Sequence, residues 1–286
     1  MGNVTDYPRK KAVSALMKSV SIERWEENKV FTDKLREKVQ SNRLAKHPII
    51  DILNQGGLSK SCLQEIHLEY REAIVKVFTD ALCMAIAQTR QLEPRLPPGS
   101  KMPPRFLLTL NTLDEFGFLP GLDVEGYYKG NPDYAHYPLF EGVLRDLGIT
   151  DTEKLSFVAS QEAVSTREYL ENHFHKYHHI LLLLAIAETQ VIMFSPPLKA
   201  AVEKEGISVT SGYYNVHGTT YDKESDGADD DHEDDLWASL NQALTPADYD
   251  EIERVSNGYL ALWNSFWHKQ MAIVAKDTLN ACSETA

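Results

Sequence analysis

The chain has little cysteine, and its cysteines are not arranged as a site. Cys62, Cys83 and Cys282 lie far apart in the sequence, and none belongs to a Cys-x-x-Cys motif. This spacing argues against a disulfide framework and against a thiolate zinc site, and it is typical of a reducing compartment. We therefore expect a cytoplasmic protein.

The sequence also lacks a long uninterrupted apolar run. Its opening residues, MGNVTDYPRKKAV, contain no apolar stretch of the kind that a secretory signal needs. The most apolar run, residues 180–194, is too short to cross a bilayer and is interrupted by Glu188, Thr189 and Gln190. We expect a buried helix here and no membrane partner. A carboxylate inside such a helix is costly unless it is paired, protonated or bound to a metal, so Glu188 is a candidate functional residue.

Basic residues are fewer than acidic ones, 29 against 42, and the acidic charge is concentrated in one segment. The formal net charge is −13, of which residues 222–235 contribute −8 through nine acids and one lysine. This balance argues against a nucleic-acid partner. An acidic run is usually a solvated loop, but His217 precedes this run and His232 lies within it, so half of a metal site is the alternative.

Apolar residues recur every three or four positions along most of the 286-residue chain, as they do in amphipathic helices. No strand-like alternation of convincing length and no internal repeat is present. The predicted fold class is all-α: a single compact bundle of about seven or more helices, in one domain over residues 1–286, with an N-terminal helical extension over about 1–43 and an acidic flap at 222–228. The helices are expected over about 14–43, from a Ser59 cap onward, 105–117, 135–148 with Gly148 as the stop, 164–195, 229–243 and 246–280.

Histidines and carboxylates on helices raise the question of a di-iron carboxylate centre. Ferritin-type centres use Glu-x-x-His twice. None of the ten histidines has a glutamate three residues before it, although Asp133 precedes His136 and Asp229 precedes His232 at that spacing. A ferritin-like arrangement is therefore a poor match.

Another helical family matches better. The run HPIIDILNQGGLSKSCLQEIHLEYREAIVKVF resembles the opening helices of the TENA/PqqC/CADD group. The segments NTLDEFGF and NPDYAHYPLFEGVLRDLGI resemble the part of the heme-oxygenase-like di-iron oxidases and oxygenases that carries a Glu and then a His ligand. Glu188 precedes His217 by 29 residues, close to the separation in that superfamily, and a His…Asp-x-x-His set follows. The resemblance implies a heme-oxygenase-like fold.

The resemblance also implies a site and an activity. Two Fe(II) ions, or a Mn/Fe pair, would be bound by Glu115, His136, Glu188, His217, Asp229 and His232, with Glu115 and Glu188 as catalytic residues. Imidazole and carboxylate suit these metals. The implied enzyme is an oxidoreductase that uses O₂ on a small amino-acid-like or fatty metabolite in natural-product biosynthesis, by N-oxygenation, oxidative C–C cleavage, or nitrile or alkene formation. An external electron donor and a homodimer are further expectations.

The sequence departs from the family pattern in two places. The residues GTTYDKESDGA separate His217 from Asp229, so Asp222 or Asp226 is an alternative carboxylate ligand. The 21 residues from Glu115 to His136 form a longer gap than usual, and Glu125 lies within it as a weaker substitute ligand.

Several assignments stay open. Arg105, before Glu115, is a candidate clamp for a substrate carboxylate, with a surface arginine as the alternative. A TenA-like cofactor-free hydrolase would instead use a cysteine nucleophile, Cys62 or Cys83, and a PqqC-like or binding-only module would use neither metal nor thiol. The group His173, His175, His178 and His179 is interpreted as surface or hydrogen-bonded residues, or as an adventitious metal binder.

Overall fold

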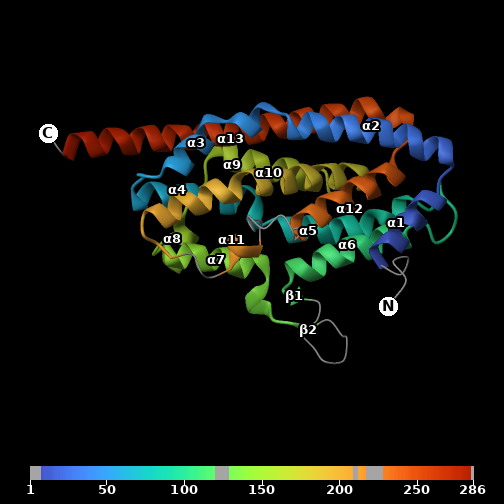
Figure 1. Cartoon of the computed structure of the whole chain (residues 1–286), viewed down its shortest axis with the longest axis horizontal. Helices are drawn as coiled ribbons and strands as arrows, with labels where there is room; N and C mark the ends of the chain where they lie inside the picture. Colours follow the sequence, from blue (N-terminus) through green and yellow to red (C-terminus); the bar gives the residue numbers. More distant parts are fainter. Residues whose placement is uncertain (1–7, 120–128, 209–211, 217–227, 285–286) are drawn as a thin grey trace.

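The chain folds into an all-α bundle, seen in a computed structural model that describes residues 8–119, 129–208, 212–216 and 228–284 (Figure 1). The helices are α1 (Pro8–Lys18), α2 (Ile22–Gln40), α3 (Pro48–Gln55), α4 (Lys60–Tyr70), α5 (Phe78–Gln88), α6 (Met102–Glu115), α7 (His136–Asp146), α8 (Asp151–Ser156), α9 (Gln161–Asn172), α10 (Tyr177–Lys204), α11 (Tyr213–Val216), α12 (Ala228–Ala243) and α13 (Tyr249–Glu284). Two short strands, β1 (Phe118–Leu119) and β2 (Lys129–Gly130), pair antiparallel between α6 and α7.

Helix α10 forms the centre of the bundle. It contacts α3, α5, α12 and α13, and nearly all of its residues from Tyr177 to Val191 are buried. Helices α2 and α13 lie together along one long edge, and α13 projects past the body toward the C-terminus (Figure 1). The predicted all-α fold class is therefore confirmed.

The length of α10 corrects one expectation. The predicted helix over 164–195 is two helices, α9 and α10, separated at residues 173–176, and α10 continues past its prolines Pro196 and Pro197 to Lys204. Proline inside a helix removes a hydrogen bond and normally ends the helix, but Ser195, Pro197 and Leu198 are buried against the bundle. Packing thus outweighs the local signal.

Helix α10 is long and apolar enough to cross a membrane, and among the described residues no other helix passes that test. Of its most apolar window, 83% is buried inside the protein. This is the position of a core helix in a helical bundle.

Local signals set several helix ends as predicted. The Ser59 side chain accepts a hydrogen bond from the Cys62 backbone N–H at the start of α4. Gly148, just past α7, has φ +78°, a left-handed conformation that glycine adopts without strain. The predicted helix over 14–43 is divided into α1 and α2, because the Ser21 side chain caps α2 by accepting from the Arg24 N–H.

The last three carboxylates of the acidic run, at residues 233–235, form ion pairs with the N-terminal helices. Arg9 of α1 binds Asp235 at 2.8 Å, and Arg36 of α2 binds Glu233 at 2.9 Å and Asp234 at 2.6 Å. Glu233 and Asp235 are both buried. A solvated loop is therefore the wrong description for these carboxylates, which tie the N-terminal helices to α12.

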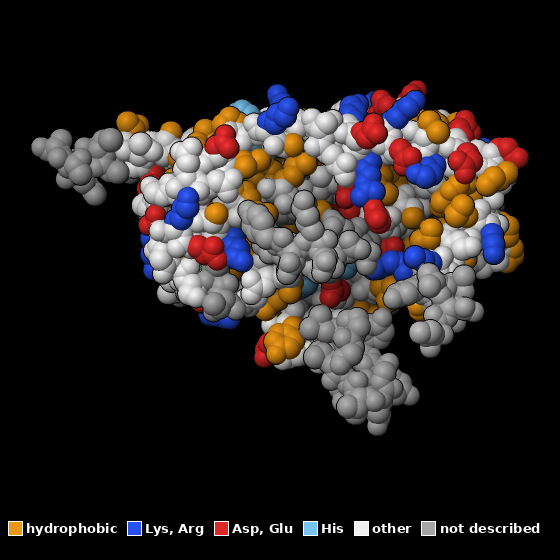
Figure 2. All heavy atoms as spheres, viewed as in Figure 1, with side chains coloured by type: hydrophobic (Ala, Val, Ile, Leu, Met, Phe, Trp, Pro, Cys, Tyr) orange, Lys and Arg blue, Asp and Glu red, His pale blue; other side chains and the backbone are white. Residues whose placement is uncertain are grey.

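The charged side chains on the outer face of α2 are exposed to solvent, unlike the buried carboxylates of α12. Lys and Arg side chains alternate with Asp and Glu side chains over this helix on the face shown in Figure 2. The exposed pair Lys29–Asp33, at 2.7 Å, is of this kind. Such exposed pairs contribute little to stability, so α2 is held mainly by its buried side, which includes Leu35 and Val39.

Candidate functional site

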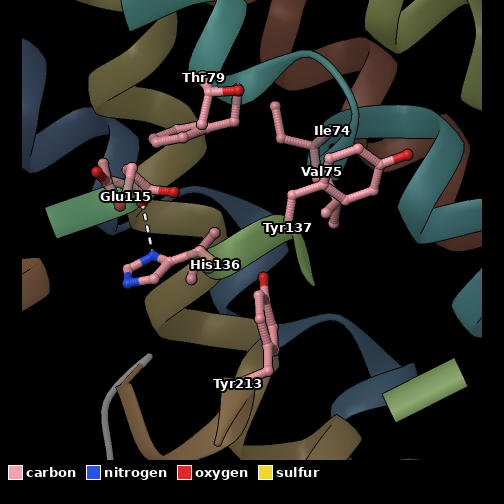
Figure 3. Close-up of a pocket in the computed structure, with 10 residues that line it drawn as sticks. Ile74, Val75, Thr79, Glu115, His136, Tyr137 and Tyr213 are labelled. Atoms are coloured by element: carbon pink, nitrogen blue, oxygen red, sulfur yellow. Dashed lines mark hydrogen bonds and ion pairs between the residues drawn. The ribbon is translucent and has the colours of Figure 1, made fainter. Parts of the chain in front are cut away.

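Side chains from six helical segments, α10 among them, enclose a small cavity. Its volume is about 20 Å³, roughly the space of one water molecule. The lining is apolar except for a few groups, of which two carboxylates and one imidazole are the most reactive (Figure 3). The lining residues are Ile74, Val75, Phe78, Thr79, Glu115, His136, Tyr137, Glu188, Val191 and Tyr213.

Glu115 and His136 meet in this cavity although they lie 21 positions apart in the sequence. Glu115 is the last residue of α6 and His136 is the first residue of α7. The β1–β2 pairing, with Phe118 opposite Gly130, brings these two helix ends together. The longer gap between the two predicted ligands is therefore closed by a hairpin.

The two side chains are in direct contact. His136 Nδ1 donates to Glu115 Oε1 at 2.9 Å, the dashed line in Figure 3. Both residues are buried, 3% exposed for Glu115 and 5% for His136. Two neighbouring ligands of one metal ion at about 2.1 Å are about 3 Å apart. The pair is thus spaced as two ligands of one ion would be, with a proton between them in this state.

A π-helix forms another wall of the cavity. Residues Arg71–Val75 connect α4 to α5 in this rarer conformation, and Ile74 and Val75 line the cavity. A π-helix adds a residue to a helical turn and changes which side chains face a site, and such segments are frequent at functional sites. The sequence of this segment gave no signal of it.

Glu188 enters from the middle of α10 and is 1% exposed. His232 of α12 lies beside it, with its Nδ1 3.7 Å from Glu188 Oε1. His232 is 3% exposed, and its Nδ1 makes no hydrogen bond with any described residue. A buried polar atom without a partner requires an explanation. A metal ion bound by both His232 Nδ1 and Glu188 would supply one.

Asp114 is a functional candidate that the sequence reasoning missed. Its Oδ2 lies 3.3 Å from His232 Nε2, on the opposite side of the ring from Glu188. A carboxylate at Nε2 favours the tautomer with the proton on that nitrogen, which leaves the lone pair on Nδ1. Asp114 precedes Glu115 directly, and this adjacency is the only signal that could have identified it.

Two tyrosines border the cavity with different roles. The Tyr137 hydroxyl points away from Glu115 and His136, and it accepts a hydrogen bond from Arg71 at 3.0 Å (Figure 3). Burial raises the pKa of Tyr137, so its hydroxyl stays protonated. The Tyr213 hydroxyl turns toward the cavity from α11 (Figure 3).

Other predicted site residues lie outside this cluster or outside the described residues. His217 follows α11 directly and is not among the described residues, nor are Asp222, Asp226, Glu125 and most of the flap at 222–228. Asp229 falls in the first turn of α12, and its side chain is likewise outside the described part. Their roles as ligands stay predictions.

Arg105 is described but does not line this cavity. It lies on α6 ten residues before Glu115, about 15 Å along the helix. Its Nε donates to Thr89 Oγ1 at 2.6 Å. The clamp role predicted for Arg105 would therefore require a substrate that extends away from Glu115.

Cys62 and Cys83 are also placed away from the cavity. Cys62 is buried in the apolar core, where burial raises the pKa of its thiol to about 12. Cys83 is exposed, and desolvation raises the pKa of its thiol as well. Neither lines the cavity, and a thiol with a raised pKa is a poor nucleophile.

Comparisons with known proteins support the fold. No protein-family model matches the chain, and no curated protein matches it. The crystal structure of a TenA family transcription regulator from Silicibacter sp. TM1040 is similar, with a TM-score of 0.52 and 13% sequence identity, over 84% of this chain and 96% of that chain. At this identity the similarity establishes the fold alone. The chain has a TenA/heme-oxygenase-like helical fold.

Proposed function

We propose that the chain is an O₂-activating oxidase or oxygenase with a non-heme di-iron or Mn/Fe centre, acting on a small amino-acid-like or fatty metabolite. The observation that carries this proposal is the convergence of Glu115, His136, Glu188 and His232, from four helices, in a buried and largely apolar place. Oxygen and imidazole nitrogen donors suit iron and manganese. Both carboxylates are buried, and a bound cation would offset part of the cost of their desolvation.

The described residues supply four donors, and the full set of six would add His217 and one carboxylate from Asp229, Asp222 or Asp226. When bound, the metal pair would supply electrons to O₂ and hold it beside the substrate. Asp114 would hold the His232 ring in the ligating tautomer. Ile74, Val191 and the other apolar lining residues would exclude bulk water.

The cavity is too small for a metabolite and has the size of an ion or water site. A substrate would therefore approach one side of the centre, after a displacement of lining side chains. Tyr213 is placed to orient it, because its hydroxyl faces the cavity (Figure 3). If the substrate does not supply all the electrons that O₂ reduction requires, an external electron donor would supply the rest.

A TenA-like hydrolase is the second candidate, and the fold fits it equally well. It would need a cysteine nucleophile, but neither described free cysteine reaches the cavity, and burial protonates Cys62. A binding-only helical module is the third candidate, and it would leave the buried carboxylates and imidazoles without a function.

Metal content after anaerobic Fe(II) loading tests the proposal. We expect about two iron ions per chain in the wild type. Glu188→Gln should remove most of this iron and leave the helical content unchanged, because the amide keeps the size of the side chain but loses the ligand charge. Glu203→Gln, on the exposed end of the same helix, is the matched control and should bind iron as the wild type does.

O₂ consumption by the loaded protein is the second readout. Iron content equal in wild type and Glu188→Gln would contradict the proposed centre. A wild type that binds no iron but hydrolyses substrates in a thiol-dependent manner would support the TenA-like alternative, and one that does neither would support the binding module.

A further inference from the structure

A second group of potential metal ligands lies at the other end of α10. His178 and His179 are in the first turn of α10, and Glu251 is in the first turn of α13. One ligand atom from each of the three lies within 4.8 Å of the others, an arrangement that could hold a metal ion. This group is distinct from the centre around Glu188, which is about 15 Å farther along the helix.

The buried imidazole at this place has no hydrogen-bond partner. His179 is 2% exposed, and neither of its ring nitrogens makes a hydrogen bond with any described residue. The Nε2 of His178 is buried and lacks such a bond too. The interpretation of these two histidines as surface or hydrogen-bonded residues is therefore wrong for His179. Leaving such nitrogens unsatisfied is unfavourable, which points to a missing ligand.

The protonation state is the one that a metal needs. Burial and the neighbouring His178 lower the pKa of His179 to about 3, and burial lowers the pKa of His178. Both rings are thus neutral near pH 7 and present a lone pair. The hydrogen bond from Lys176 lowers the pKa of Glu251, so the third group is an ionised carboxylate.

The spacing fits a small tetrahedral ion. Ligands at about 2.0–2.1 Å around a tetrahedral Zn²⁺ are about 3.3 Å apart. His179 Nε2 and Glu251 Oε1 are 3.5 Å apart, too far for a good hydrogen bond but close to this ligand spacing. A side-chain rotation within the 4.8 Å group would complete the set. Three protein ligands leave the fourth position for water.

One cation already competes for the carboxylate. Lys176 Nζ lies 2.5 Å from Glu251 Oε1. Asp248 and Arg95 are the other charged groups near His178, and His173 stacks obliquely on His179 with ring centroids 5.1 Å apart. Removing the ammonium of Lys176 should therefore strengthen metal binding, because the ammonium and the metal ion compete for the Glu251 carboxylate.

The geometry points to a second metal site, formed by His178, His179 and Glu251, that takes a borderline divalent ion such as Zn²⁺ and links the start of α10 to the start of α13. Two imidazoles and one carboxylate form a donor set that binds zinc in proteins. The bound ion would satisfy one buried ring nitrogen of His179 and hold together the starts of two helices that are 72 residues apart in the sequence.

Zn²⁺ titration of the full chain, by calorimetry and by competition with a chromophoric chelator, tests this site. We expect the wild type to bind about one more Zn²⁺ per chain than His179→Ala does. Glu251→Gln should weaken that binding by about tenfold or more. Lys176→Met should instead strengthen it, an increase that a merely structural role of these residues would not produce. His175→Ala, an exposed neighbour, is the matched control and should bind as the wild type does.

The thermal midpoint gives an independent readout. Zn²⁺ should raise it more in the wild type than in His179→Ala or Glu251→Gln, because binding to the folded state alone stabilises it. Equal stoichiometry and affinity in His175→Ala, Glu251→Gln and the wild type would overturn the site, even if His179→Ala failed to fold. So would extra binding that appears only at millimolar Zn²⁺, which would identify an adventitious ion.

Discussion

The buried imidazole of His67 should make stability fall as the solution becomes acidic. His67 is fully buried in α4, with Nδ1 2.7 Å from the Leu63 carbonyl and Nε2 2.7 Å from the Tyr214 hydroxyl. The carbonyl can only accept, so Nδ1 carries the proton and Nε2 accepts from Tyr214. Desolvation lowers the pKa of His67 from 6.5 to about 4. The folded protein therefore resists a protonation that the unfolded chain accepts.

The sign and size follow from proton linkage. Above about pH 6.5 the ring is neutral in both states and contributes no pH dependence. Below it the unfolded chain binds the proton first, so the free energy of unfolding falls until about pH 4. The shift from 6.5 to about 4 corresponds to a total loss of about 3 kcal/mol, of which about 2 kcal/mol is lost between pH 7 and pH 5.

Urea unfolding followed by tryptophan fluorescence at pH 7, 6 and 5 measures this loss. His67→Gln should be less stable than the wild type at pH 7, because the buried hydrogen bonds are rearranged. Its stability should nevertheless fall less between pH 7 and pH 5, by about 2 kcal/mol. Parallel pH profiles for the two proteins would refute the reasoning, whatever their absolute stabilities.

Two further substitutions test the surroundings of the site. Gly117→Ala should lower both stability and iron binding, because Gly117 has φ +81° and a Cβ there would lie 2.7 Å from a backbone nitrogen before α7; thermal unfolding should show a loss of about 3 kcal/mol. Gly99→Ala, at φ +92° in open space, is its control and should cost about 1 kcal/mol. Arg36→Met should destabilise by about 3 kcal/mol in urea unfolding, because it leaves the buried Glu233 carboxylate without its cation. Arg24→Met removes only an exposed pair and should cost under about 1 kcal/mol; equal losses in the two arginine variants would contradict this account.

Periodicity was sufficient to predict the helical class and several helix ends. The Ser59 cap and the stop at Gly148 are local signals, and both appear in the structure. The break at residues 173–176 and the passage of α10 through Pro196 and Pro197 were not predictable in this way. They are set by packing between segments that are distant in the sequence, which apolar spacing alone does not encode.

The candidate site was predictable only in part. Glu188 was identified because a carboxylate in an apolar helix is costly, and Glu115 and His136 because of the family resemblance. The hairpin that joins the last two depends on the β1–β2 pairing, for which the short strands carry no pattern. Asp114 was missed for a related reason. Asp114 is a candidate because its side chain lies beside His232, 118 residues away in the sequence. The spacing of residues within one helix does not predict such contacts between helices.

Residues of the acidic segment have different roles although they are adjacent in the sequence. Glu233, Asp234 and Asp235 bind arginines of α1 and α2, so they stabilise the bundle. His232, directly before them, turns its Nδ1 toward Glu188. Neighbouring residues on a helix face different directions, about 100° apart per residue. A charge count cannot separate these roles, whereas the helical register of α12 does.

The two histidine and carboxylate groups on α10 also constrain how metal measurements are interpreted. Both use neutral imidazole and carboxylate donors, and such donors bind Zn²⁺ more tightly than Fe²⁺. Total metal content therefore cannot assign an ion to either place. The groups are about 15 Å apart along the helix, a separation at which substitutions act independently. Iron lost with Glu188→Gln and zinc lost with His179→Ala consequently report on different ends of α10, and only the former bears on oxygen chemistry.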